Sequence, residues 1–159
     1  MPSILFVCTA NLFRSPIAAL SFRRAIERNQ PAGEWVVESA GTWTKDGLSP
    51  QSFTVKIANR LGLQGLEHHL TRQVNIEMME QFDLIIVMET GHKEALCSEF
   101  RSLQKRVFLL SEMADGIPYN IADPTNPDIN PNDVANEIDR LINKGFNKII
   151  QCIISIIGG

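Results

Sequence analysis

Two residues near the start of the chain have side chains and a spacing suited to phosphate chemistry. Cys8 and Arg14 are separated by five residues, in the segment Cys8-Thr9-Ala10-Asn11-Leu12-Phe13-Arg14-Ser15. A cysteine thiolate is a strong nucleophile, and a guanidinium group can bind two phosphate oxygens at once. If the segment links a strand to a helix, its backbone N–H groups can also bind an anion and stabilise the thiolate. The spacing alone is also compatible with a buried strand-end cysteine and a surface arginine.

The residues on both sides of this segment favour such a strand-to-helix link. Residues 3–8 form a mostly apolar run, typical of a strand buried on both faces of a parallel sheet. Ser15-Pro16 then opens a helical pattern that continues to Ile26, and proline is well tolerated in a first helical turn. Because ligands in parallel α/β folds bind at the carboxyl ends of strands, Cys8 is expected at a binding edge.

Strands and helices alternate along the rest of the chain. Strands are predicted over residues 35–37, 82–88 and 106–110. Helices are predicted over residues 49–61, from a cap at Thr90 to Phe100, and over residues 134–157. Loops are predicted over residues 40–50 and 114–131, and the second is long enough to be functional. The pattern predicts one α/β domain over residues 1–159, with a four-stranded parallel sheet, helices on both faces and a phosphate loop after the first strand.

Composition narrows the function classes. The net charge of -3 and the pI of about 5.6 argue against nucleic-acid binding. The three cysteines (8, 97 and 152) do not form a disulfide pattern, and their usage suits a reducing, cytoplasmic compartment. The most apolar segment, residues 149–157, is too short to cross a bilayer, and the N-terminus does not read as a signal peptide. Three histidines without ligand spacing give no sign of a metal site, and no cofactor is expected.

Five segments, in order and spacing, resemble the low-molecular-weight protein tyrosine phosphatase family over nearly the whole chain. Residues 7–16 resemble its phosphate loop and residues 82–88 its central strand. The other three segments are Ser39-Ala40-Gly41-Thr42, His69-Leu70-Thr71-Arg72 and Asp123-Pro124, the last of which resembles the acid loop. The resemblance implies a protein tyrosine phosphatase that hydrolyses phosphotyrosine in proteins through a phosphocysteine intermediate. It also implies that the loop binds inorganic phosphate or another oxyanion.

The family resemblance implies a role for each matched position. Cys8 would attack phosphorus, Arg14 would bind the equatorial oxygens, and Asp123 would act as general acid and then general base. Residues 9–15, named above, would line the phosphate site. Ser15 would donate to the thiolate, and Asn11 would hold the loop in shape with support from Ser39 and His69.

The residues by themselves offer two candidates for the acid. Asp115 lies in the same predicted loop as Asp123 and is the rival acid. Pro124 favours Asp123, because a proline restricts the conformation of the residue before it.

The chain departs from the family pattern in three places. Most members have glycine where this chain has Ala10, and many have a second loop cysteine where it has Phe13. The acid loop continues as Thr125-Asn126-Pro127 and lacks the usual tyrosines. Leu12 and Trp43 are therefore the candidates for the remaining walls of the substrate pocket, and an aromatic wall could stack on a phosphotyrosine ring.

Three other functions remain as alternatives. A thiol-linked arsenate reductase would need further cysteines in a disulfide relay, and Cys97 and Cys152 are far apart in sequence. Protein arginine phosphatases of the same family resemble this chain but have threonine at the position of Leu12. A non-catalytic phosphate-binding module would be expected to lack the nucleophile or the acid, and this chain has candidates for both.

Overall fold

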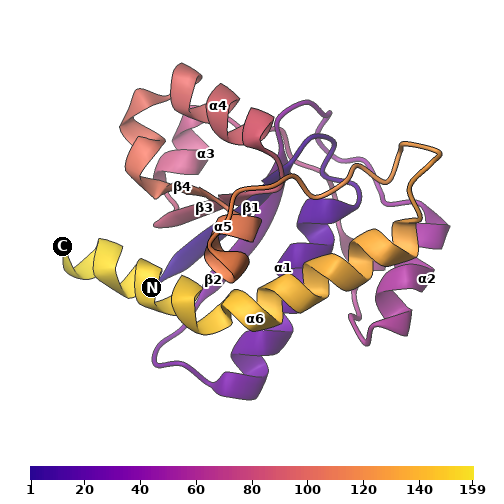
Figure 1. The fold of residues 1–159 in the computed structure, drawn as a ribbon, viewed down its shortest axis with the longest axis horizontal. Helices are drawn as coiled ribbons and strands as arrows, with labels where there is room; N and C mark the ends of the chain where they lie inside the picture. Colours follow the sequence, from indigo (N-terminus) through magenta and orange to yellow (C-terminus); the bar gives the residue numbers. More distant parts are fainter.

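The computed structural model describes residues 1–159 and contains one four-stranded parallel sheet (Figure 1). Its strands are β1 (Ser3–Cys8), β2 (Val36–Gly41), β3 (Leu84–Val87) and β4 (Val107–Leu109), in the order β2-β1-β3-β4. Apolar residues fill β1 and β3 because both strands lie inside the sheet with a covered surface on each side. The predicted α/β class and the four parallel strands are confirmed.

Helices cover both faces of the sheet, and side chains of β1 alternate between the two cores. Ile4 and Phe6 belong to the larger core, whereas Leu5 and Val7 belong to the smaller one. The larger core is closed by α1 (Arg14–Asn29), α2 (Ser52–Arg60), α5 (Leu110–Asp115) and α6 (Pro131–Gly158), and the smaller by α3 (Ile76–Glu80) and α4 (Thr90–Glu99). Figure 1 shows α1 and α6 on one side of the sheet and α3 and α4 on the other.

A cluster of aromatic rings holds α1 against the sheet. Phe22 of α1 is fully buried, and its ring centroid lies 5.6 Å from that of Phe6, 6.4 Å from that of Trp35 and 5.3 Å from that of Phe146 on α6. Burying one such ring contributes about 1.5–3 kcal/mol. Since α1 begins at Arg14, this packing also fixes the helix end that borders the phosphate loop.

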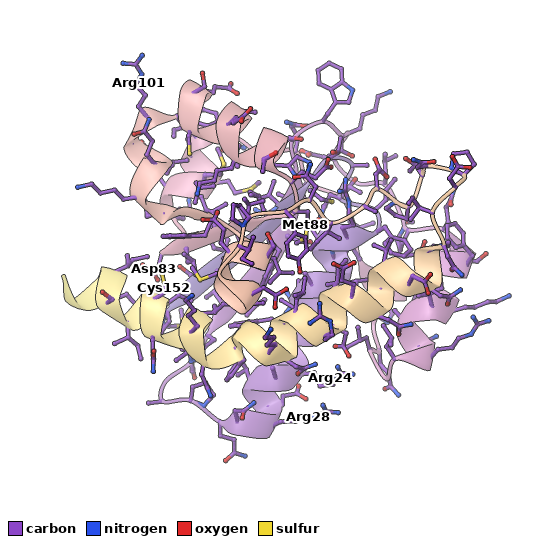
Figure 2. All side chains as sticks on the ribbon, in the orientation of Figure 1. Arg24, Arg28, Asp83, Met88, Arg101 and Cys152 are labelled. Atoms are coloured by element: carbon purple, nitrogen blue, oxygen red, sulfur yellow. The ribbon has the colours of Figure 1, made fainter.

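The register of the sheet brings distant segments to one edge. Cys8 pairs with Gly41 of β2, and Val7 pairs with Val87 of β3. The backbone N–H of Ile121 donates to the carbonyl oxygen of Met88, just after β3, at 3.0 Å, and Figure 2 labels Met88. The loops that follow β1, β2 and β3 therefore meet the acid loop at the carboxyl end of the sheet.

Several element boundaries differ from the sequence-based expectation. Pairing with β1 extends β2 through Gly41, so the loop predicted over residues 40–50 begins later. The chain turns into α5 at Leu110, where a strand end was predicted, and α5 runs into the predicted loop over residues 114–131. Glu89, not Thr90, caps α4. The short helix α3 and the 3₁₀ segments Leu66–His68 and Arg101–Arg106 were not predicted, because segments of this length have too little periodicity.

Candidate active site

A cavity of about 400 Å³ opens above the phosphate loop, residues 8–15, at the carboxyl edge of the sheet. Three separate parts of the chain line it: the phosphate loop, the segment from the end of β2 into α2, and the acid loop. The lining residues are Cys8, Thr9, Ala10, Leu12, Phe13, Arg14, Trp43, Gln51, Phe53, Thr54, Asp123, Pro124 and Thr125. The structure therefore brings Cys8, Arg14 and Asp123 to one cavity.

The floor of the cavity holds the nucleophile candidate and the anion-binding candidate. Cys8 is 3% exposed, and its Sγ lies 3.0 Å from the hydroxyl oxygen of Ser15. Arg14 is also 3% exposed, and its Nη1 donates to the Glu89 carboxylate at 2.7 Å and to the Ile121 carbonyl at 2.9 Å. The guanidinium is therefore held in place by groups from two other segments.

Asn11 is fully buried and organises the loop from within. Its backbone φ is 60°, a left-handed conformation that asparagine tolerates. Its side-chain nitrogen donates to Ser15 Oγ at 2.8 Å and to Ser39 Oγ at 3.0 Å, and its side-chain oxygen accepts from the Arg72 backbone N–H at 3.0 Å. His69 Nε2 lies 2.7 Å from the Asn11 carbonyl oxygen. Ser15, Ser39 and His69 therefore all meet at Asn11.

The end of β2 must be glycine for the loop to keep its shape. A Cβ atom added at Gly41 would lie 2.5 Å from the carbonyl oxygen of Thr9. The backbone N–H groups of Thr42 and Trp43 then donate to the carbonyl oxygens of Cys8 and Thr9 at 2.9 and 3.0 Å. The loop is thus anchored to the end of the neighbouring strand as well as to its own helix.

Ala10 needs no strained backbone. Among the loop residues only Asn11 has a positive φ, so Ala10 does not adopt the left-handed conformation that would favour glycine. The replacement of the glycine that most family members have at this position is compatible with an intact loop.

The carboxylate of Asp123 has one oxygen bound locally and the other facing the arginine. Oδ1 accepts from the Thr125 backbone N–H at 2.9 Å and from the Thr125 hydroxyl at 2.7 Å, whereas Oδ2 lies 3.8 Å from Arg14 Nη2. Partial burial raises the pKa of Asp123, but the Thr125 hydrogen bonds and the charge of Arg14 outweigh burial, and the net pKa is lowered. Asp123 is therefore ionised when the cavity holds no anion.

The rival acid lies outside this cavity. Asp115, at the end of α5, accepts from Lys144 Nζ and from the Tyr119 hydroxyl, both at 2.5 Å. These hydrogen bonds hold the pKa of Asp115 below its ordinary value. Asp115 therefore joins α5 to α6.

Two residues after β3 enter the site and were missed in the sequence. Glu89 pairs with Arg14, and His92, which is 6% exposed, lies 2.8 Å from the Thr9 hydroxyl through Nε2. Burial and the nearby charge of Arg14 lower the pKa of His92 to about 4, so its ring is neutral near pH 7. The sequence held an indication of Glu89, because this residue directly follows the strand predicted over residues 82–88. The carboxyl end of such a strand lies at the binding edge of the sheet.

The cavity walls are apolar. Leu12 and Trp43, the two predicted wall residues, both line the cavity, and Trp43 is 83% exposed. Phe53, in the first turn of α2, forms a further wall that was not predicted, and its ring packs near that of Phe13. The phosphate loop therefore lies at the bottom of an aromatic-walled opening.

Neither of the other cysteines lines this cavity. Cys97 lies on α4 against the smaller core, and Cys152 lies near the C-terminal end of α6, where Figure 2 labels it. Burial raises the pKa of both thiols. No three or more His, Cys, Asp or Glu side chains are grouped to hold a metal ion, and none of the helices combines the length and apolarity needed to cross a bilayer.

A parallel α/β fold with a cysteine and a buried arginine in one strand-to-helix loop is the arrangement expected of a thiol-based phosphatase. The family model described as "Low molecular weight phosphotyrosine protein phosphatase" matches residues 3–153. The chain therefore belongs to this family and is a cysteine-dependent phosphatase that acts on phosphorylated proteins.

Relatives of the chain include phosphatases with two different substrates in their names. The protein-tyrosine-phosphatase Wzb of Escherichia coli (strain K12) is 35% identical over 109 residues, covering 67% of this chain and 68% of Wzb. A protein-arginine-phosphatase of Bacillus subtilis (strain 168) is 30% identical over 123 residues, covering 76% of this chain and 78% of the relative. A solved YwlE arginine phosphatase, a Cys-to-Ser variant with a phosphorylated active-site serine, has a TM-score of 0.81 at 27% identity, covering 89% and 91% of the two chains.

Proposed function

We propose that residues 1–159 act as one phosphatase domain that hydrolyses phosphotyrosine in proteins, with Cys8 as nucleophile, Arg14 as phosphate ligand and Asp123 as general acid and base. The observation that carries this proposal is the composition of the cavity. Leu12, Trp43 and Phe53 form apolar walls directly above the loop that holds Cys8 and Arg14. An aromatic ring bound there would bury apolar surface and stack on aromatic side chains.

In the first step the Cys8 thiolate attacks phosphorus. A sulfur–phosphorus bond forms, the phosphorus–oxygen bond to the tyrosine breaks, and its electron pair goes to the phenolic oxygen. That oxygen takes a proton from Asp123. The backbone N–H groups of the loop and the Arg14 guanidinium stabilise the charge on the equatorial oxygens, where it develops in the transition state. A Ser15 hydroxyl 3.0 Å from Sγ can stabilise the thiolate before attack and as it departs in the second step.

In the second step Asp123 removes a proton from water, whose oxygen attacks the phosphocysteine. The sulfur–phosphorus bond breaks, its electron pair returns to Cys8, and inorganic phosphate leaves. The phosphorylated serine of the YwlE variant supports covalent transfer to this loop position in a relative.

Substrate binding must change the protonation of Asp123 before it can act as an acid. In the free protein Arg14 stabilises the carboxylate. A bound phosphoryl group would neutralise Arg14 and place negative charge near Oδ2, and both effects raise the pKa of Asp123. Because Thr125 already occupies Oδ1, we infer that the proton resides on Oδ2, the oxygen that faces the cavity.

Phosphoarginine is the second candidate substrate, because arginine phosphatases are among the relatives. A guanidinium leaving group needs polar partners in the opening, and Leu12 presents a branched apolar side chain where arginine phosphatases have threonine. Leu12, together with the aromatic walls, favours the phosphotyrosine assignment. The cytoplasmic location stays a prediction from cysteine usage.

The decisive experiment compares phosphotyrosine, phosphoserine and phosphoarginine peptides of one sequence on the wild-type protein, Leu12→Thr and Cys8→Ser. We expect the wild type to prefer phosphotyrosine, Leu12→Thr to shift the ratio toward phosphoarginine, and Cys8→Ser to lose turnover while still binding vanadate. A wild-type preference for phosphoarginine would overturn the substrate assignment. Turnover by Cys8→Ser above a few per cent of wild type would overturn the assignment of the nucleophile.

A further inference from the structure

Thr9 directly follows the nucleophile, and its hydroxyl takes part in one side-chain hydrogen bond. The oxygen lies 2.8 Å from His92 Nε2, and the residue lines the cavity above the phosphate loop. The bond can be formed in two ways: either His92 donates to the Thr9 oxygen, or the Thr9 hydroxyl donates to an unprotonated ring nitrogen. In the first arrangement the Thr9 hydroxyl can still donate a hydrogen bond to a bound substrate. In the second its hydrogen is already used, and it can only accept.

The other ring nitrogen decides between these arrangements. The backbone N–H of Glu89 donates to His92 Nδ1 at 3.1 Å, so Nδ1 carries a lone pair and no hydrogen. A neutral imidazole then has its one hydrogen on Nε2. Burial and the positive charge of Arg14 both favour the neutral ring. His92 therefore donates through Nε2 to the Thr9 oxygen.

With its oxygen accepting from His92, the Thr9 hydroxyl keeps its own hydrogen for another partner. No protein acceptor takes this hydrogen, and the residue borders the space where a phosphoryl group would lie. A hydroxyl that accepts one hydrogen bond is polarised and becomes a better donor in the next. Hydrogen bonds to charged acceptors are also about twice as strong as those between neutral groups.

We propose that Thr9 is a side-chain hydrogen-bond donor to the substrate's phosphoryl group, and that His92 is a positioning residue that sets the direction of this donation. The inference rests on the proposed reaction at Cys8. It adds one donor to the backbone N–H groups and Arg14.

Glu89 links this donor to the arginine. Its carboxylate binds Arg14 Nη1 at 2.7 Å, and its backbone N–H binds His92. One residue at the cap of α4 thereby orients both a guanidinium and, through an imidazole, a hydroxyl. The arrangement requires β3 and β1 to be neighbours, because Thr9 follows one strand and Glu89 the other.

The test is a double-mutant cycle on Thr9 and His92 with a phosphotyrosine peptide. Thr9→Val has nearly the same shape but no hydroxyl, and Thr9→Ser restores the donor. We expect Thr9→Val to lower kcat/KM about 10- to 100-fold, the scale of one hydrogen bond to a charged group, and to weaken inhibition by inorganic phosphate. Thr9→Ser should recover most of the loss. His68→Gln, at an exposed histidine outside the site, is the matched control and should behave as wild type.

The double-mutant cycle also shows whether His92 acts by orienting the Thr9 hydroxyl or only by supporting the fold. His92→Phe should lower kcat/KM in the wild type but change it less than twofold in the Thr9→Val background, because the hydroxyl it orients is already gone. Fully multiplicative effects, or a Thr9→Val variant with wild-type kcat/KM, would overturn the proposal. Nitrogen NMR of His92 at pH 7 should show hydrogen on Nε2 and none on Nδ1, and the opposite tautomer would overturn the inference directly.

Cys8→Ser and Thr9→Val together separate a wrong role for Thr9 from a wrong reaction at Cys8. If Cys8→Ser keeps turnover, the reaction at Cys8 is wrong and the inference falls with it. If Cys8→Ser is inactive and Thr9→Val is unaffected, only the role of Thr9 is wrong.

Discussion

The ring centroid of Phe53 lies 6.5 Å from that of Phe13, with an angle of 33° between the two rings. Phe13 closes the phosphate loop at the cap of α1, and Phe53 lies in the first turn of α2. The contact therefore supports a cavity wall from the side of the loop. Phe53 also gives the cavity an aromatic wall, although the acid loop of this protein lacks the tyrosines that are usual in the family.

Phe53→Ala should raise KM for a phosphotyrosine peptide about three- to tenfold with little change in kcat, because an aromatic pair contributes about 0.5–1.5 kcal/mol beyond area burial. The inhibition constant of inorganic phosphate should stay unchanged, since phosphate has no ring to stack. Steady-state kinetics on both compounds check this. Equal losses for phosphotyrosine and inorganic phosphate would instead indicate that Phe53 supports the loop through Phe13.

Asp123→Asn should slow hydrolysis of phosphotyrosine by roughly 100- to 10,000-fold, the usual scale of general acid–base catalysis. The loss should be smaller for aryl phosphates with acidic phenols, which need less protonation as they leave. Asp115→Asn is the control, because Asp115 lies on α5 and bonds to Lys144 and Tyr119. If the two variants exchanged these patterns, the acid would be Asp115.

Peroxide should inactivate the protein with poor recovery on adding dithiothreitol. Although Cys8 is largely buried, it lines the open cavity, where a molecule as small as peroxide can reach it. A thiolate reached in this way is oxidised to sulfenic acid, and without a nearby thiol it proceeds to sulfinic acid. Phe13 occupies the position of the second loop cysteine, and neither Cys97 nor Cys152 lines the cavity. Phosphate should protect Cys8, and Phe13→Cys should restore recovery. Mass spectrometry that found a disulfide from Cys8 to another native cysteine would contradict this and would support an arsenate reductase.

The free energy of unfolding should fall as pH drops from about 6.5 to about 4, partly because of His92. Its folded pKa of about 4 lies below the ordinary value near 6.5, so in this window the unfolded chain binds more protons than the folded protein. The folded state thus loses stability as pH falls, by a few kcal/mol at most for this group. Burial is the largest cause of the lowered pKa of His92 and Arg14 adds to it, whereas the negative charges of Glu89 and Asp123 partly offset both effects.

Denaturant unfolding at pH 7, 5.5 and 4.5 measures this slope. His92→Phe should flatten it, whatever its effect on stability at pH 7, because the variant has no proton to bind there. His68→Gln is the control and should keep the wild-type slope. An unchanged slope in His92→Phe would show that other groups, such as the half-buried His69, carry the pH dependence.

The sequence by itself determined the parts of this protein that depend on neighbouring residues. The apolar runs of β1 and β3 were predicted because strands buried on both faces leave a continuous signal. The loop from Cys8 to Arg14 was predicted because its anion-binding backbone N–H groups, its nucleophile and its guanidinium all lie in one short, continuous segment. The helix α6 was predicted because its apolar stripe repeats over many turns.

Tertiary structure decided what depends on segments that meet only after folding. Asp123 lies at the site because the backbone N–H of Ile121, two residues earlier, binds the Met88 carbonyl just after β3, whereas Asp115 ends α5 and bonds to Lys144 of α6. No local pattern encodes that difference. The partnerships of Glu89 with Arg14 and of His92 with Thr9 join residues 75 and 83 positions apart. They exist because β1 and β3 are neighbours in the sheet. Patterns of neighbouring residues in the sequence indicate which chemistry a residue is suited to. Its partners are set by the packing of strands and helices around it.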